Sequence, residues 1–292
     1  MISRGIPSVI VAIAVVAGTA SAESIAGRYS FGLYGGQSTA DLAELNDFFE
    51  FFNENAGIRA NRLQEYDKFD NGPSANADIR YGFTENVLFG LSIGYSEFSV
   101  DVHQDWPAID ADNIIIIGLD RTVTVRTVPI VVSAYYSQPV IPNLRVTAGA
   151  GIGVWGTELL SESNHVFSQD DLQYQGELEF GQDPFESGNR SWTGREVGYQ
   201  LSLGGEYFLT DHLVVAGEGI YRFIEVPEVT NPLEEPFEGY EVFDGADQDI
   251  PFGSYTYYMG DGQPRRTLSP TGKPIALDLS GATLSLGLRV YF

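Results

Sequence analysis

Cysteine is absent from this chain of 292 residues, and histidine occurs only three times. The lack of cysteine excludes a disulfide framework, a thiol nucleophile and any cysteine-ligated metal. Basic residues are also scarce: 16 lysines and arginines stand against 40 aspartates and glutamates, which gives a formal net charge of −24. Such an acidic surface repels nucleic acid and attracts cations. We therefore expect no nucleic-acid partner, and no motif indicates a cofactor.

Long apolar runs are also missing from the chain. Beyond the N-terminus, no stretch approaches the roughly 18 apolar residues of a transmembrane helix; Ile114 to Ile117 and Val128 to Val132 have the length of strands. The N-terminus combines Arg4, an apolar stretch from Ile10 to Ala17, and the small residues Ala20-Ser21-Ala22. This order is typical of a secretory signal peptide. We expect residues 1–22 to be removed, leaving a single mature domain over 23–292.

What the chain does contain is alternation of apolar with polar or small residues, the period of a strand with two different faces. Eight segments show it: residues 29–34, 75–83, 87–95, 122–136, 144–154, 197–207, 213–223 and 284–292. The facing of the fourth segment is ambiguous, and we favour Val128, Ile130 and Val132 on its apolar face. The glycine and aromatic content also suits an all-β chain.

The connections between these segments alternate in length. Residues 84–86, 138–142 and 210–212 are short turns, whereas 37–74, 101–121, 157–190 and 225–273 are long. Short turns at one end and long loops at the other are typical of barrels that span the bacterial outer membrane, whereas a secreted β-sandwich has comparable loops at both ends. The pattern predicts an all-β, closed, antiparallel up-and-down transmembrane β-barrel of eight strands. Alternation around Leu172 to Phe180 predicts a further hairpin and leaves ten strands as an alternative.

The last eight residues form an amphipathic strand that runs to the terminus. Ser285, Gly287, Val290 and Phe292 match, without departure, the pattern of a polar residue, a glycine, an apolar residue and a final aromatic. This tail resembles the assembly signal of bacterial outer-membrane β-barrel proteins. With the alternation and loop lengths, the whole chain is similar to their small eight-stranded group, which includes the outer membrane protein A transmembrane domain and the opacity-type porin-like proteins. The resemblance implies location in the cell outer membrane, contact with its lipid and lipopolysaccharide, and recognition by the barrel-assembly machinery.

Charged residues occur on the polar faces of the strands, which a barrel turns towards its lumen. Besides Asp78, they are Arg80, Arg145, Glu196, Glu206, Glu218, Arg222 and Arg289. Eight strands leave room only for side chains or one small ligand, and buried charges persist when paired. We expect a structural charge network in which Arg222 and Arg289 pair with glutamates. A gated narrow pore is the alternative.

The long connections hold 31 of the 40 acidic residues. Carboxylates attract hard divalent cations, so Ca²⁺ or Mg²⁺ at the loops is one expectation, although no calcium-binding motif is present. In the first connection, Asp41-Leu42-Ala43-Glu44 resembles a capping box. Leu42, Leu45, Phe48, Phe49 and Phe52 then recur at helical spacing, which predicts a short amphipathic helix on the rim or over the mouth of the barrel.

The sequence favours a non-enzymatic integral outer-membrane barrel with an envelope-structural or surface-interaction role. A narrow porin-like channel for small solutes is one alternative. An outer-membrane lipid or peptide hydrolase is another, because His212 follows Asp211, while His103 and His165 lie in long connections. His212 is in a short turn, at the end opposite the long loops, and no recognisable serine motif accompanies the other two. We therefore predict no catalytic residues and no metal site.

Overall fold

The computed structural model describes residues 24–55, 67–110, 113–167, 190–233, 236–243, 255–258 and 264–292. The predicted signal peptide lies outside these residues, as does the hairpin predicted around Leu172 to Phe180.

Eight strands close into one antiparallel barrel. In barrel order they are β1 (Tyr29–Thr39), β13 (Gly281–Tyr291), β7 (Leu213–Phe223), β6 (Arg190–Phe208), β5 (Leu144–Phe167), β4 (Asn113–Ile141), β3 (Val87–Asp110) and β2 (Asn71–Gly82). The first and last strands pair directly, from Ser30 with Tyr291 to Ser38 with Thr283. The predicted fold class and strand number are confirmed, and the ten-stranded alternative is wrong for the barrel.

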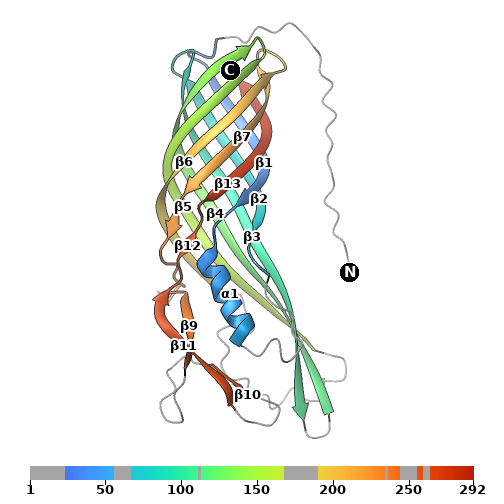
Figure 1. Cartoon of the computed structure of the whole chain (residues 1–292). Helices are drawn as coiled ribbons and strands as arrows, with labels where there is room; N and C mark the ends of the chain where they lie inside the picture. The colour runs from blue at the N-terminus through green and yellow to red at the C-terminus, as the bar shows by residue number, and fades with distance from the viewer. Residues whose placement is uncertain are drawn as a thin grey trace.

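The two ends of the barrel differ as the connection lengths predict. Short turns join β2 to β3, β4 to β5 and β6 to β7 at one end, which is at the top of Figure 1. At the other end, the prediction of a loop over 101–121 is wrong, because β3 and β4 continue as a paired hairpin as far as Asp110 and Asn113. In this part of β3 the apolar residues occupy the inward-facing positions, as Phe98 and Val100 do, so the pattern of the preceding residues does not continue in phase.

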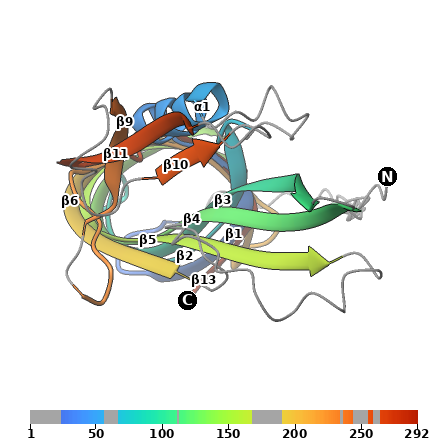
Figure 2. The ribbon, with the colours of Figure 1, turned by 90° about the horizontal axis from the view of Figure 1, so that it is seen from below.

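The fourth long connection also contains regular structure. The short strands β8 (Glu225–Val226) and β12 (Leu277–Asp278) pair with each other. Strands β9 (Glu238–Phe243), β10 (Tyr255–Tyr258) and β11 (Pro264–Pro274) form a three-stranded sheet. Figure 2 shows this sheet and the helix α1 on one side of the barrel mouth, while the long hairpins of β3, β4 and β5 extend on the other.

The outer surface of the wall carries a continuous apolar band. Large exposed apolar side chains occur on all eight strands, including Leu33, Ile79, Leu91, Val132, Ile152, Leu203, Tyr221 and Leu286. On β6 the band runs from Val197 to Tyr207. Ten steps of about 3.4 Å along a strand tilted by about 40° make a band about 26 Å high. The predicted facing of β4 is confirmed, because Val128, Ile130 and Val132 all point outward.

The band ends at a cluster of outward-facing charges on three neighbouring strands. Arg126 of β4 contacts Glu97 of β3, with Nε 3.0 Å from the carboxylate, and its Nη1 lies 3.9 Å from Glu158 of β5. Glu97 follows Tyr95 on the outer face of β3, so the apolar band on that strand covers residues 87–95.

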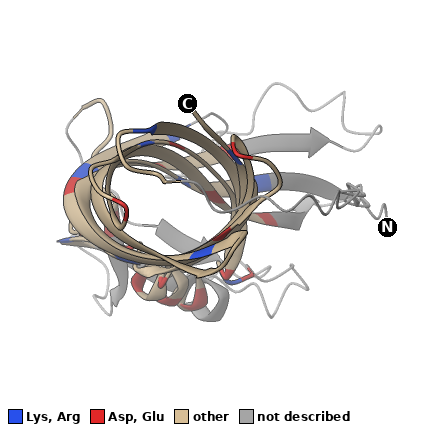
Figure 3. Cartoon of the chain, turned by 90° about the horizontal axis from the view of Figure 1, so that it is seen from above, with Lys and Arg blue, Asp and Glu red and all other residues tan. Residues whose placement is uncertain are grey.

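Helix α1 (Ala43–Asn55) confirms the predicted amphipathic helix. Leu42, Leu45, Phe48 and Phe49 are buried at the loop end of the barrel; the side chain of Phe52 lies outside the described residues. The predicted capping box is wrong, because the Asp41 amide donates to the Ser280 carbonyl at 2.8 Å instead of to Glu44. The Glu44 carboxylate accepts a hydrogen bond from the Ala276 amide, 2.9 Å away. Acidic positions on α1 are visible in Figure 3. Among the described residues, no helix is both long and apolar enough to span a membrane.

Candidate functional site in the barrel lumen

The interior of the barrel is filled in successive layers. At the short-turn end, Ile25, Leu88, Phe208, Val214 and Tyr291 form a buried, largely apolar cluster. A network of buried charges follows, then a small cavity. At the loop end lies a larger apolar cluster, the loop-end core, which contains Leu45, Phe49, Phe98, Val125, Trp155, Trp192 and Leu277.

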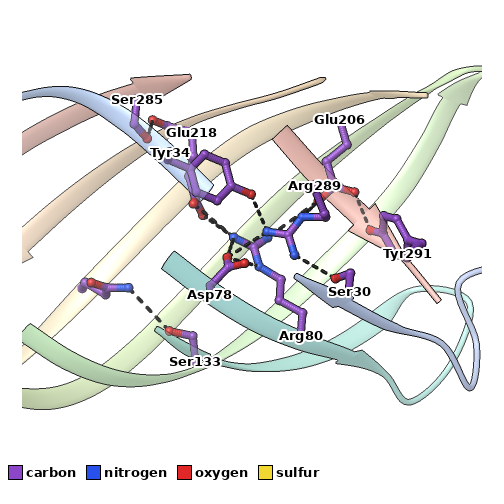
Figure 4. A network of polar contacts seen from close by, with 11 residues as sticks. Ser30, Tyr34, Asp78, Arg80, Ser133, Glu206, Glu218, Ser285, Arg289 and Tyr291 are labelled. Atoms are coloured by element: carbon purple, nitrogen blue, oxygen red, sulfur yellow. Dashed lines mark hydrogen bonds and ion pairs between the residues drawn. The ribbon is translucent and has the colours of Figure 1, made fainter. Parts of the chain in front are cut away.

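Arg289 of β13 is the centre of the charge network (Figure 4). Its side chain is 0% exposed, and its guanidinium contacts two carboxylates, Asp78 at 2.8 Å and Glu206 at 3.0 Å. It also donates to the Ser30 hydroxyl at 2.8 Å and to the Tyr34 hydroxyl. The network therefore connects β13 with β1, β2 and β6 through side chains.

Arg80 of β2 is the second cation of the network. It donates to Asp78 through Nε at 2.8 Å, and its Nη2 lies 3.1 Å from Glu218 on β7. Its guanidinium also stacks over the ring of Tyr135 from β4, 3.8 Å from the centroid, a geometry in which a cation is attracted to the ring face. Together Arg80 and Arg289 fasten the opposite sides of the wall to each other.

Glycine makes room for this packing at one position in particular. Gly32 faces the lumen on β1, and a Cβ there would lie 2.7 Å from both the Asp78 carboxylate and the Tyr34 ring. Any other residue would displace one of these partners. The packing of the network therefore requires glycine at position 32 as well as the charged residues.

Three of the seven predicted lumen residues lie outside the network. Arg145 lies near the short-turn end, where it donates to the Ser137 hydroxyl and to the Glu85 carbonyl. Glu196 accepts a hydrogen bond from the Val197 amide and has no ion pair among the described residues. Arg222 has no carboxylate partner among them either, so the expected pairing of Arg222 with a glutamate is wrong.

Sequence reasoning also missed partners that the fold brings together. Asp78 bridges both arginines, although the sequence analysis noted only its polar face. Tyr291 donates to Glu206 at 2.7 Å. Tyr34, Tyr135 and Tyr291 are all buried. Alternation along the strands could have placed these tyrosines in the lumen, because each lies at a lumen-facing position of its strand. Aromatic residues in barrels are otherwise expected at the membrane interface.

The predicted assembly-signal residues lie on β13 and just beyond it. Ser285 donates to the Glu218 carbonyl at 3.2 Å, and Gly287 packs closely against the Leu33 carbonyl of β1. Val290 pairs with Phe31, and the exposed Phe292 donates its amide to the Tyr29 carbonyl. These contacts close the barrel wall. Recognition by assembly machinery stays a prediction.

His212 lies at the short-turn end without a catalytic partner. Its Nδ1 is 3.0 Å from the Tyr291 carbonyl oxygen and 3.0 Å from the Arg28 guanidinium. The side chains of His103 and His165 lie outside the described residues. In the described part of the chain, no three metal-ligating side chains come together. Cation binding by the loops stays a prediction.

A scan against protein-family models found no match, and a search of curated proteins found none. Among solved structures, the chain is similar to the outer membrane protein OprG of Pseudomonas aeruginosa, with 12% identity, a TM-score of 0.38, and 92% of this chain and 99% of that chain covered. It is similar to Neisserial surface protein A, with 11% identity, a TM-score of 0.38, and 91% and 98% covered. The outer membrane protease OmpT of Escherichia coli gives 11% identity, a TM-score of 0.28, and 94% and 100% covered. At identities this low, residue roles in those proteins do not carry over to this chain.

Proposed function

We propose that the chain is a non-enzymatic, non-conducting barrel of the outer membrane that holds a folded extension outside the lipid. The exposed apolar band supports the membrane location. It surrounds a closed wall, and its estimated height of about 26 Å agrees with the roughly 25 Å apolar band of outer-membrane barrels. A soluble protein rarely leaves so large an apolar surface in contact with water.

The filled lumen is the observation that carries the non-conducting part of the proposal. The side chains of Arg80, Asp78, Glu206 and Arg289 are at most 3% exposed, and they meet in the middle of the barrel. Apolar clusters lie on both sides of them along the barrel axis. Paired charges in this setting form cross-links that water and ions do not pass, so a narrow porin-like channel is the less favoured function.

The extension at the loop end supports a structural or surface-interaction role. Strands β3, β4 and β5 continue beyond the apolar band, and α1 packs its apolar face into the loop-end core that they share. The resulting extension is a packed structure with acidic residues on the surface of its helix. It suits a fixed contact surface outside the membrane better than it suits a hydrolase, since His212 lies at the opposite end.

Single-channel recording tests the proposal. The mature chain, refolded and inserted in a planar bilayer, should show no steady conductance. The variant Arg289→Ser, which shortens the central side chain and breaks two ion pairs, should show brief openings. Arg190→Ser, at an exposed position at the start of β6, is the matched control and should stay silent. A large and steady conductance of the wild type would overturn the non-conducting function, and recovery of the native chain as a soluble protein would overturn the membrane location.

A further inference from the structure

A cavity of about 40 Å³, lined by both apolar and polar side chains, lies in the lumen between the charge network and the loop-end core. Arg222, Ser74, Ser96, Gln200, Thr283 and Ser285 line it. Arg222 and Ser74 lie four residues beyond Glu218 and Asp78 on their strands, which places the cavity on the loop side of the network. A buried water needs roughly 10–15 Å³ measured in this way, so the cavity accommodates a small ion with little more than a water or two.

Arg222 is a buried cation to which the described residues supply no counter-charge. Its side chain is 5% exposed, and it donates to the Thr39 carbonyl at 2.7 Å and to the Ser96 hydroxyl at 3.4 Å. Its Nε has no hydrogen-bond partner among the described residues, and no carboxylate there forms an ion pair with it. The buried Ser74 hydroxyl, which also lines the cavity, is likewise without a partner. Two unsatisfied donors therefore share one small space.

The charge network does not neutralise Arg222 effectively. Asp78, Glu206 and Glu218 outnumber Arg80 and Arg289 by one, which leaves one net negative charge in the network. Glu218 is four residues from Arg222 along β7, about 13 Å for an extended strand. Coulomb energy falls inversely with distance, so its attraction for Arg222 is about a third of that of a carboxylate at about 4 Å. Glu218 is moreover already paired with Arg80.

We propose that this cavity binds one small monovalent anion of chloride size. The Nε of Arg222 and the hydroxyl of Ser74 supply hydrogen bonds, and the guanidinium supplies the opposite charge. Water would satisfy the two donors but would leave the buried charge of Arg222 uncompensated. The volume excludes bulky anions such as gluconate. The bound ion neutralises Arg222 and so stabilises the folded barrel, in addition to the cross-links made by Arg80 and Arg289.

Refolding in different salts tests this site. The mature chain is refolded into detergent micelles in sodium bromide or in sodium gluconate at equal ionic strength, and unfolding is followed in urea. Bromide should raise the urea concentration at the midpoint of wild-type unfolding, and this rise should level off as the site fills. In Arg222→Gln, the bromide concentration needed should rise about ten- to hundredfold, as expected for the loss of a hydrogen bond to a charged group. Arg126→Gln, which removes an outward-facing guanidinium, should respond to bromide like the wild type.

Bromide also reports its own position, because its anomalous scattering locates it in a crystal of the wild type. A peak within hydrogen-bonding distance of Arg222 and Ser74 is the expected result, and this measurement decides the question even if Arg222→Gln does not refold. Equal midpoints of the wild type in bromide and gluconate, or a cavity that contains only water in bromide-grown crystals, would overturn the proposal.

Discussion

The two halves of strands β3 and β4 differ in polarity although they keep the same alternation. Within the apolar band, Leu91 and Ile93 of β3 point outward, while Ser92 faces the lumen. A few residues further along the same strand, Glu97 points outward, while Phe98 and Val100 are buried inside. The pleat is continuous, so the side of the strand that faces inward does not change. Within the band the outward-facing side is apolar, and beyond the band the inward-facing side is apolar.

The medium around the wall explains this inversion. In the proposed location, lipid surrounds the band, where an apolar exterior is favourable and the narrow lumen can hold charges that pair with one another. Water surrounds the extension, where burial of Phe98, Val125 and Trp155 supplies the stabilisation of an ordinary soluble core. The cluster of Arg126, Glu97 and Glu158 lies at the boundary between the part of the wall with an apolar exterior and the part with an apolar interior.

The largest expected effect comes from breaking the polar filling of the membrane half. Arg289→Met leaves Glu206 without its principal cation and removes one of the two arginines that contact Asp78. Loss of one partner of a buried ion pair costs about 3–5 kcal/mol of unfolding free energy. Urea unfolding of the refolded chain in lipid vesicles measures it. Arg190→Met, at the exposed start of β6, should change stability by no more than about 0.5 kcal/mol.

A second variant separates the loss of a pair from a general loss of packing. Adding Glu206→Gln to Arg289→Met removes one of the orphaned charges, so part of the lost stability should return. Equal stability of Arg289→Met and Arg190→Met would mean that water reaches the charge network. The lumen within the apolar band would then not be filled by paired charges, and the contrast with the apolar core of the extension would be wrong.

A matched pair of substitutions on the outer face of β3 tests the inversion itself. Leu91 lies at the middle of the apolar band and Ser99 lies beyond Glu97, both exposed on the same face of one strand. Leu91→Arg should cost about 2–4 kcal/mol, the cost of an arginine facing lipid at the membrane midplane. Ser99→Arg should change stability by less than about 0.5 kcal/mol, like other surface changes. Equal effects in the same unfolding assay would show that the band does not face lipid.

The sequence was sufficient for the half of the barrel that carries the apolar band, because alternation is strict there. The eight strands, the short turns and the lumen-facing register of Arg80, Glu206 and Arg289 all follow from a period of two. Beyond the band, the apolar residues move to the inward-facing positions, so the pattern changes phase, and the continuation of β3 to Asp110 could not be distinguished from a loop. Pairing inside the lumen was beyond reach for another reason. It depends on the stagger between strands, which brings Asp78 to Arg289 and leaves Arg222 without a carboxylate partner in the described part of the chain.

The smallest expected effect concerns the charge cluster at the boundary between these two parts of the wall. Hydrogen bonds from Tyr95 and Arg126 lower the pKa of Glu97 below its usual value. A lowered folded-state pKa adds stability that is complete above the ordinary glutamate pKa of about 4.3 and is lost as the pH falls further. Because the Arg126 and Glu97 side chains are 37% and 29% exposed, the contribution should not exceed about 1 kcal/mol. Glu97→Gln, which keeps the shape of the side chain, should therefore be slightly less stable than the wild type at pH 7 and should match it at a pH below the lowered pKa. Comparing the two proteins at each pH in the urea assay removes the titration of the other carboxylates. A stability gap that stays constant down to the lowest pH would show that shape or packing, rather than the charge of Glu97, supports this boundary.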